Sequence, residues 1–446
     1  MASFRIAEWS RLDAAGRHQL LARPALRAAR DLDVRVRAII ASVRAEGDAA
    51  LLRLARELDG AELATLRVSE AEFSAAAAEL ADDAKAAIAV AIRNVTRFHE
   101  AQVAAPIRVE TAAGVVCERV SRPLGAVGLY VPAGSAPLPS TAIMLGVPSA
   151  IAGCPVRVLC TPPRPDGRAD PAVLFAARAC GIKDVFKAGG AQAIAAMAYG
   201  TESVPRVARL FGPGNAWVTA AKAIVAADPA GAAQDMPAGP SEVMVIADRL
   251  ADPRFVALDL LSQAEHGPDS HVVLVSTAAD MIPRVQAEID AALPSLPRRP
   301  IIEQALGHAI AVLVADLDEA VAVANDYAPE HLILQVAEPR AVAAIVTTAG
   351  SVFLGRWTPE AVGDYCSGTN HVLPTYGHAR AYGGLSVADF QRGMTIQEVS
   401  LNGLRGLAPT VRTLAGLEGL EAHARAVTIR LDAADTRPGA GTGAAP

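Results

Sequence analysis

Residues 252–269, Asp-Pro-Arg-Phe-Val-Ala-Leu-Asp-Leu-Leu-Ser-Gln-Ala-Glu-His-Gly-Pro-Asp, determine how the rest of the chain is interpreted. Asp252-Pro253 is the pair expected at the start of a helix, and Gly267-Pro268 forces its end. Between these limits apolar residues recur with helical spacing. Apolar runs at 242–247 and 272–276 flank the segment. The sequence therefore predicts a strand–helix–strand unit, which implies parallel strands.

The end of this helix carries two polar side chains that could bind a metal. Gln263 and His266 are three residues apart, so they project from one face of the last turn. A carboxamide oxygen and an imidazole beside a loop could form half of a metal site. They could equally be two solvated residues at a helix terminus, and the pair alone does not decide between these readings.

Length, charge and cysteine usage limit the class of protein. A chain of 446 residues is too long for one ordinary core, so we expect two or more domains. Its formal net charge of −6 argues against a nucleic-acid-binding surface, which needs clustered Lys and Arg. The five cysteines are scattered without a Cys-x-x-Cys pair, so the sequence suggests neither a thiolate zinc site nor a CxxC redox centre and favours a reducing compartment.

The ends and the apolar runs of the chain give no sign of export or membrane insertion. Glu8 stands where a signal peptide would carry its apolar run, and no apolar stretch reaches membrane-spanning length. We therefore expect a cytoplasmic protein.

The rest of the chain contains both helical and β-rich patterns. Residues 1–110 have helical spacing, and after Val115 short β-rich runs alternate with helical stretches until helices return after Asp389. The pattern predicts two α/β domains that divide near Tyr130 and again near Ser241. The expected strands are 115–120, 126–131, 156–160, a run near 185, 207–211, 242–247, 272–276, 309–315, 331–336 and 351–354. Residues after about Asp435 are expected to form a flexible tail.

Four glycine-containing loops are candidates for ligand binding. They are Tyr130–Ser135, Gly189–Gln192, Phe211–Asn215 and Pro237–Ser241. Ligands of open α/β sheets bind beyond the carboxyl ends of the strands, and backbone N–H groups in such loops can face a phosphate. None of the loops matches G-x-G-x-x-G, and turn chemistry explains any one of them. Together they favour ligand binding without identifying the ligand.

Acid–base and polar residues gather in the last third of the chain. Glu330-His331 follows Pro329 and opens an apolar run, and a carboxylate beside an imidazole is a natural acid–base unit. The alternative is a solvated loop carboxylate and a strand-edge histidine. The polar stretch 363–377 reads as a long loop, in which Asp364 could bind a metal and His371 a substrate.

Four motifs, taken in order, give the chain a specific resemblance. They are Gln-Ala-Glu-His-Gly-Pro-Asp-Ser from Gln263, Tyr-Ala-Pro-Glu-His-Leu from Tyr327, Gly-Asp-Tyr-x-Ser-Gly-Thr-Asn-His-Val-Leu-Pro-Thr from Gly363, and Glu-Gly-Leu-x-Ala-His from Glu418. With these motifs the sequence resembles the histidinol dehydrogenase family from about residue 30 to residue 430.

The resemblance implies a set of site residues. Glu330 and His331 match the catalytic pair of the family. The positions that match zinc ligands, for one Zn²⁺ per subunit, are Gln263, His266, Asp364 and His423. The positions that match substrate contacts are Ser241, Gln263, His266, His331, Asp364, His371, Glu418 and His423. The positions that match NAD⁺ contacts are Tyr130, Gln192 and Asn215.

The resemblance also implies a reaction. The expected activity is zinc-dependent oxidation of L-histidinol to L-histidine through L-histidinaldehyde, with two successive hydride transfers to NAD⁺, at the end of histidine biosynthesis.

A fold and an assembly are implied as well. The fold would be α/β with two incomplete Rossmann-like domains. The expected parts are an N-terminal helical segment (1–26), a first α/β domain (27–129 and 242–385), a second with the NAD-binding loops (130–241), a C-terminal helical segment (386–434) and the tail (435–446). The terminal segments would mediate a homodimer whose active site is shared between subunits.

Three other functions remain as alternatives. One is a non-catalytic relative retained as a binding protein, which would be expected to have lost some polar site residues. A related zinc- and NAD-dependent dehydrogenase of another small polar alcohol would differ in substrate-side residues, whereas His371, Glu418 and His423 are all present here. A zinc hydrolase with Glu330 as base would leave the glycine loops unexplained.

Overall fold

The computed structural model describes residues 3–23, 29–133, 136–237 and 239–436. The chain divides into two compact units. The first unit comprises residues 1–102 and 123–390, and the second comprises residues 103–122 and 391–446.

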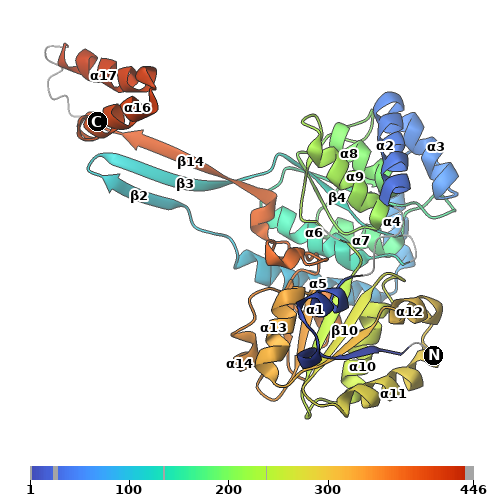
Figure 1. Cartoon of the computed structure of the whole chain (residues 1–446). Helices are drawn as coiled ribbons and strands as arrows, with labels where there is room; N and C mark the ends of the chain where they lie inside the picture. The colour runs from blue at the N-terminus through green and yellow to red at the C-terminus, as the bar shows by residue number, and fades with distance from the viewer. Residues whose placement is uncertain (1–2, 24–28, 134–135, 238, 437–446) are drawn as a thin grey trace. The chain divides into compact units, whose positions relative to one another are not determined.

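A parallel six-stranded sheet forms one half of the first unit (Figure 1). Its strand order is β1-β11-β10-β9-β12-β13, and every neighbouring pair is parallel. The strands are β1 (Arg5–Glu8), β9 (Glu242–Ala247), β10 (His271–Ser276), β11 (Ile310–Leu313), β12 (His331–Gln335) and β13 (Ser351–Leu354).

Helices cover both faces of this sheet, because side chains alternate along each buried strand. On β9, Val243 and Val245 pack with α10, α11 and α12, whereas Met244 and Ile246 pack with α1, α13 and α14. These helices are α1 (Ala14–Leu20), α10 (Pro253–Ala264), α11 (Met281–Ala292), α12 (Arg299–Leu306), α13 (Leu317–Tyr327) and α14 (Pro339–Ala343). The start predicted for the helix after Asp252 is confirmed, since the Asp252 side chain accepts the Arg254 N–H at 3.0 Å.

A parallel five-stranded sheet, with order β6-β5-β4-β7-β8, forms the other half of the first unit. Its strands are β4 (Ala126–Tyr130), β5 (Val156–Thr161), β6 (Asp184–Lys187), β7 (Arg209–Phe211) and β8 (Ala233–Gln234). The helices that pack on it are α2 (Ala29–Glu46), α3 (Asp48–Leu58), α4 (Glu70–Glu79), α5 (Asp82–Glu100), α6 (Pro139–Ile151), α7 (Pro171–Ala179), α8 (Gly190–Tyr199) and α9 (Ala216–Ala227).

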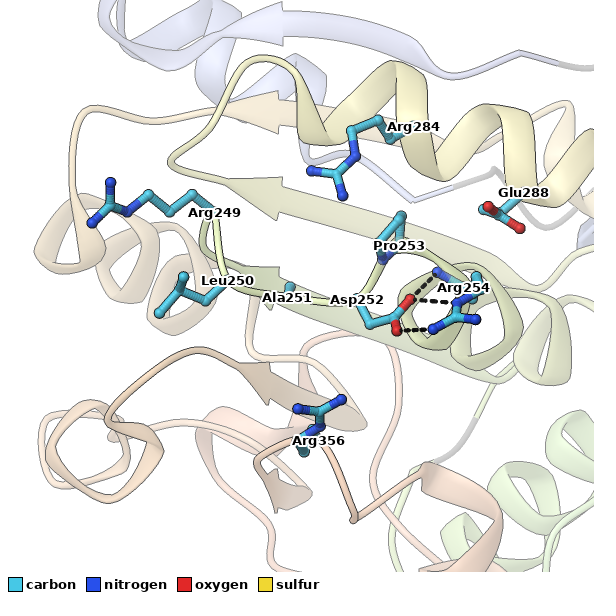
Figure 2. Close-up of a pocket in the computed structure, with 9 residues that line it drawn as sticks. All are labelled: Arg249, Leu250, Ala251, Asp252, Pro253, Arg254, Arg284, Glu288 and Arg356. Atoms are coloured by element: carbon cyan, nitrogen blue, oxygen red, sulfur yellow. Dashed lines mark hydrogen bonds and ion pairs between the residues drawn. The ribbon is translucent and has the colours of Figure 1, made fainter.

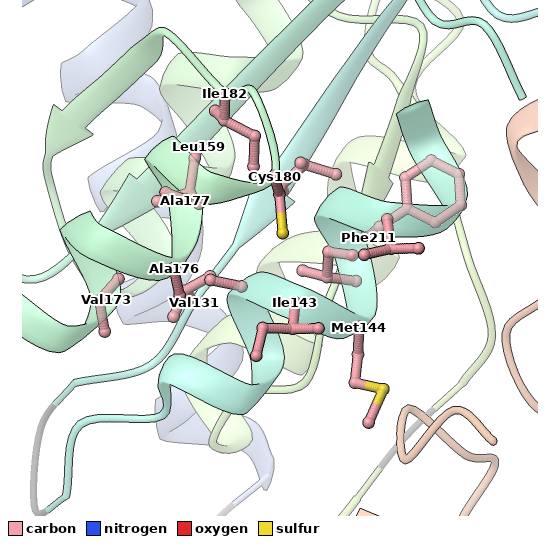
Figure 3. Packing of buried hydrophobic residues seen from close by; sticks show 14 of the residues in the cluster. Val131, Ile143, Met144, Leu159, Val173, Ala176, Ala177, Cys180, Ile182 and Phe211 are labelled. Atoms are coloured by element: carbon pink, nitrogen blue, oxygen red, sulfur yellow. The ribbon is translucent and has the colours of Figure 1, made fainter. Parts of the chain in front are cut away.

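Helix α6 connects this second core to the candidate site residues. Ile143 and Met144 of α6 lie in the apolar cluster that also contains Leu159 and Phe211 (Figure 3). The Met144 carbonyl accepts a hydrogen bond from Asn370 Nδ2 at 2.8 Å, one residue before His371. The polar stretch that precedes His371 is therefore anchored on the second core.

The second unit contains the strands β2 (Ile107–Ala112), β3 (Val115–Pro123) and β14 (Gln391–Val399) and the helices α16 (Leu401–Glu418) and α17 (Glu421–Asp435). Strands β2 and β3 are antiparallel, and β14 pairs with β3.

Three parts of the sequence-based expectation were wrong. The N-terminal stretch is not purely helical, because β1 joins the six-stranded sheet through β11. The run from Val115 belongs to the three-stranded sheet and not to a parallel one. Residues 391–399 form a strand where helices were expected. The prediction failed because most of this strand is exposed, so its sequence shows no apolar alternation.

The α/β class with two parallel sheets is confirmed. The predicted tail lies outside the described residues from position 437 onward, as do residues 24–26 of the predicted N-terminal segment. Among the described residues, no helix combines the length and the apolar character that a bilayer span requires. The short remaining elements are α15 (Glu360–Tyr365) and the 3₁₀ turns at Trp9–Arg11, Leu293–Ser295, His378–Arg380 and Val387–Phe390.

Candidate active site

Glu330 and His331 lie at the amino end of β12, inside the first unit. Helix α13 ends at Tyr327, and Ala328, with φ 54° and ψ 67°, turns the chain toward Pro329 and the strand. Both side chains are buried, with 5% and 4% of their surfaces exposed. The solvated-loop alternative is therefore wrong for this pair.

The backbone of the neighbouring strand fixes both side chains. The Glu242 N–H donates to Glu330 Oε2 at 2.9 Å, and the Glu242 carbonyl lies 3.2 Å from His331 Nδ1. A carbonyl oxygen only accepts, so His331 Nδ1 carries a proton, and Nε2 has a lone pair when the imidazole is neutral. Within the described part of the chain, Nε2 is buried without a hydrogen-bond partner, 3.4 Å from Asp364 Oδ1. Nε2 can take a proton from a substrate when the imidazole is neutral, and a cation bound at the neighbouring carboxylates would favour that neutral form.

The charges around the pair shift its pKa values. Burial lowers the pKa of His331, but the carboxylates of Glu360, Glu330 and Asp364 outweigh it and raise the pKa well above its ordinary value. Burial raises the pKa of Glu330 to about 8. Glu330 can therefore hold or accept a proton in the neutral to alkaline range.

A cluster of three possible ligands lies beside His331. One atom each of His266, Glu360 and Asp364 lies within 4.8 Å of the other two. Asp364 sits on the short helix α15, so the prediction of a continuous loop from residue 363 was wrong at its start. The ion pairs that Glu330, Glu360 and Asp364 make within the described residues are all with His331. Crowded carboxyl groups whose pKa values are raised, together with nitrogen and oxygen donors, fit a divalent cation such as zinc, which would stabilise their charged forms.

Gln263 lies in the last turn of α10 and is fully buried. In the carboxamide orientation that satisfies its neighbours, its nitrogen donates to the Glu360 carboxylate and its oxygen accepts the Glu242 N–H at 3.1 Å. The structure therefore places Gln263 against Glu360, which lies beside His266 and Asp364, while the role of these residues as zinc ligands stays a prediction.

Glu360 is a site residue that the sequence interpretation missed. It is 1% exposed, and burial raises its pKa well above the ordinary value, with Asp364 and Glu330 adding to the shift. A signal was present, because Glu360 and Asp364 are four residues apart after Pro359 and therefore share one face of a short helix.

The other predicted substrate residues divide between the two units. Ser241 precedes β9, and its carbonyl accepts the His271 N–H at 3.1 Å. His371 Nε2 lies 3.5 Å from Thr141 Oγ1, and burial lowers the pKa of His371 to about 4. His423 of α17 belongs to the second unit, and so does Glu418 at the end of α16.

Three of the four glycine loops lie at the carboxyl ends of β4, β6 and β7, as expected for ligand binding. Gly134 and Ser135 of the first loop lie outside the described residues. The Gly190 N–H donates to the Tyr130 hydroxyl at 3.0 Å, which joins the first two loops. Asn215 caps α9 by accepting the N–H groups of Trp217 and Val218.

Gln192 is the third predicted NAD⁺ contact, and it lies buried on α8. The fourth loop differs from the other three, because it precedes β9 at the amino end of the other sheet. Ala238 of that loop lies outside the described residues.

An open hollow of about 460 Å³ lies near the opposite, carboxyl end of β9 (Figure 2). Four arginines line it. Arg254 is paired with Asp252, and the guanidinium carbon of Arg356 lies 4.8 Å from the centre of the Trp357 ring. None of the predicted site residues lines this hollow.

Comparison with known proteins agrees with the motifs. A family model described as histidinol dehydrogenase matches residues 22–431. A histidinol dehydrogenase of Xanthomonas euvesicatoria is 56% identical over 96% of this chain and 100% of its own length. One from Vibrio cholerae is 53% identical over 96% of this chain and 98% of its own length.

A solved structure gives the same result. The crystal structure of histidinol dehydrogenase from Elizabethkingia anophelis superposes with a TM-score of 0.92 at 42% identity, covering 98% of this chain and 99% of the other. The four motifs, the family model and the full-length similarity lead to one conclusion: this chain belongs to the histidinol dehydrogenase family.

Proposed function

We propose that this protein oxidises L-histidinol to L-histidine through L-histidinaldehyde, with two NAD⁺ as hydride acceptors, as the final steps of histidine biosynthesis. Family membership supports the overall reaction. The observation that carries the chemistry is the buried His331 imidazole, whose Nδ1 is fixed on a carbonyl. Its Nε2 lies 3.4 Å from the Asp364 carboxylate and has no hydrogen-bond partner among the described residues.

The first oxidation needs a base at the alcohol. His331 Nε2 accepts the hydroxyl proton of histidinol while the C–H bond breaks and its hydride passes to the first NAD⁺. The product is the aldehyde. Burial of the site keeps bulk water away from this intermediate.

The second oxidation needs a hydrated aldehyde. Glu330 accepts a proton from the water that adds to the carbonyl carbon, and His331 accepts the proton of the resulting diol as the second hydride leaves. The overall balance is one histidinol, two NAD⁺ and one water giving one histidine carboxylate, two NADH and three protons.

Gln263, His266, Asp364 and His423 are the residues we propose as zinc ligands, with one Zn²⁺ per subunit. The acidic cluster beside His331 supports a cation at the first-unit part of this set. Zinc bound there would supply a fixed point that orients the imidazole and amino groups of the substrate.

The remaining substrate contacts are proposed for Ser241, His371 and Glu418, and the NAD⁺ contacts for Tyr130, Gln192 and Asn215. The hydrogen bond between Gly190 and Tyr130 and the start of α9 after Asn215 support the second set, because helix starts favour phosphate.

We further propose a cytoplasmic homodimer in which His423 and Glu418 enter the partner's site. Helices α16 and α17 leave large apolar side chains exposed, as an interface would require. The most exposed are Leu417 at 80%, Ile429 at 65% and Leu414 at 54%. A C-terminal dimerisation segment (386–434) and an α/β domain that includes residues 242–385 remain part of this proposal. Helices α2 to α5, which the sequence assigned to that domain, pack instead on the five-stranded sheet.

The test follows absorbance at 340 nm with purified protein, NAD⁺ and limiting L-histidinol, with and without a chelator. Two NADH per histidinol, lost on chelation and regained with zinc, are expected. One NADH per histidinol would indicate an alcohol dehydrogenase that stops at the aldehyde. NADH from another polar alcohol only, or hydrolysis without NADH, would overturn the proposed substrate or the reaction class.

A further inference from the structure

Glu242, the first residue of β9, holds both members of the Glu330–His331 pair with its main chain. Its N–H donates to Glu330 Oε2 at 2.9 Å, and its carbonyl accepts from His331 Nδ1 at 3.2 Å. A displacement of this one peptide segment would therefore move the carboxylate and change the tautomer and orientation of the imidazole together.

The side chain of Glu242 is in turn fixed by four donors in a fully buried position. Arg23 Nε donates to Oε2 at 2.6 Å and Arg23 Nη2 to Oε1 at 2.9 Å, which is a two-point ion pair. The Tyr327 hydroxyl donates to Oε2 at 2.8 Å, and the Tyr376 N–H donates to Oε1 at 2.9 Å. A buried carboxylate is tolerable only when it is paired and hydrogen-bonded in this way.

Arg23 also holds the chain on the other side of the catalytic pair. Its Nη2 donates to the Tyr327 carbonyl at 2.8 Å, and its guanidinium carbon lies 3.9 Å from the centre of the Tyr327 ring. Tyr327 is three residues before Glu330, and only Ala328 and Pro329 separate the two. Arg23 therefore connects Glu242 with the segment that leads into Glu330 and His331.

We propose that Arg23 is a positioning residue, which acts through Glu242 and Tyr327 to set the geometry of Glu330 and His331. The inference rests on the proposed function for the roles of that pair. The N-terminal segment would then have a part in the active site, because it contributes Arg23 although it is far from Glu330 and His331 in the sequence.

The main test compares Arg23→Lys and Arg23→Ala with Arg17→Met. Arg17 is the matched control, because it also fixes the N-terminal segment, through the Trp9 carbonyl at 3.3 Å, without contact to Glu242. Lysine keeps the charge of Arg23 but loses the two-point geometry. We expect kcat to fall about 10-fold in Arg23→Lys and about 100-fold in Arg23→Ala, with KM values and zinc content within about twofold, since small displacements of catalytic groups have effects of this size.

Two further readouts separate positioning from a general structural role. Millimolar guanidinium should restore activity to Arg23→Ala at least fivefold, whereas equal concentrations of urea or sodium chloride should not. Arg23→Lys should lower kcat far less in a His331→Gln background than in the wild type, because residues that act through one another are not additive. Additive losses, or equal losses in Arg17→Met, would overturn the inference.

A spectroscopic readout keeps this test independent of the substrate. Nitrogen-15 spectra of labelled histidine report the tautomer of His331, with its signal assigned by its loss in His331→Gln. In spectra taken at a pH where the imidazole is neutral, we expect the Nδ1–H form in the wild type and a mixture in Arg23→Lys. A wild type that makes no NADH from histidinol refutes the proposed function alone, while an unchanged tautomer in Arg23→Lys refutes the positioning role.

Discussion

Lys222 and Asp235 form a buried ion pair that holds both polar groups of one glycine in the Phe211–Asn215 loop. Lys222 Nζ donates to the Gly212 carbonyl at 3.0 Å, and Asp235 Oδ2 accepts the Gly212 N–H at 2.8 Å. Gly212 has φ +119°, and a Cβ there would lie 2.2 Å from the Tyr130 carbonyl oxygen, so only glycine fits. The ion pair thus sets the path of a loop proposed to bind NAD⁺.

Lys222→Met should destabilise the protein and weaken NAD⁺ binding. Removing one partner leaves the Asp235 charge buried, which typically costs about 3–5 kcal/mol of unfolding free energy. Urea unfolding measures the first effect and the KM for NAD⁺ the second. Lys187→Met is the control, since Lys187 pairs with the more exposed Glu72 outside this loop. An unchanged KM for NAD⁺ in Lys222→Met would contradict the role given to the loop.

Glu330→Gln should stop the reaction after the first oxidation. Glutamine cannot accept the proton of the water that adds to the aldehyde, while His331 remains to serve the alcohol. The expected yield is one NADH per histidinol, with aldehyde trapped by a hydrazine reagent. Two NADH at the wild-type rate would show that another group activates the water.

His331→Gln should cripple turnover to a small but measurable residual rate and leave the zinc content unchanged, because His331 is assigned as a base and not as a ligand. Atomic absorption of the purified variant against wild type measures the metal. Loss of zinc in this variant would show that the assignment is wrong.

His423→Asn should lower the zinc content and should complement Glu330→Gln on mixing. After free subunit exchange half of the dimers are mixed, and each mixed dimer has one intact site, which gives roughly a quarter of the wild-type activity. Mixed dimers are detected with two different affinity tags. Mixed dimers without activity would argue against a site shared between chains.

His271 should make the protein less stable in acid. Burial lowers the pKa of His271 to about 4, below its ordinary value near 6.5. Between these values the unfolded chain binds the proton and the folded chain does not, so stability falls as the pH drops from about 6.5 toward 4. At pH 5 this lowers the unfolding free energy by about 2 kcal/mol relative to pH 7. Urea unfolding of the wild type and of His271→Gln at pH 5 and pH 7 measures this difference in unfolding free energy. An equal loss of stability at pH 5 in the variant would exclude His271 as the source.

Local patterns predicted local structure, and the motifs named several residues that the structure brings together around His331, whose roles stay predictions. The start of α10 followed from Asp252-Pro253, and the burial of Glu330-His331 agreed with the apolar run behind it. Strand β14 escaped prediction because most of its side chains are exposed, so its pairing with β3 leaves no apolar signal. The bond between Arg23 and Glu242 joins residues 219 positions apart, and no spacing rule reaches that far.

The place of β1 has a consequence for synthesis of the protein. Arg5–Glu8 pair with Ile310–Leu313, and Arg23 meets the Tyr327 carbonyl, so the first residues to leave the ribosome find their partners among the residues made some three hundred positions later. At about 5–20 residues per second, that delay is roughly 15 to 60 s. For most of that time β1 has no sheet to join, because the other five strands of the six-stranded sheet all lie after residue 241. The catalytic pair is therefore among the last parts of the molecule to reach its final geometry during translation.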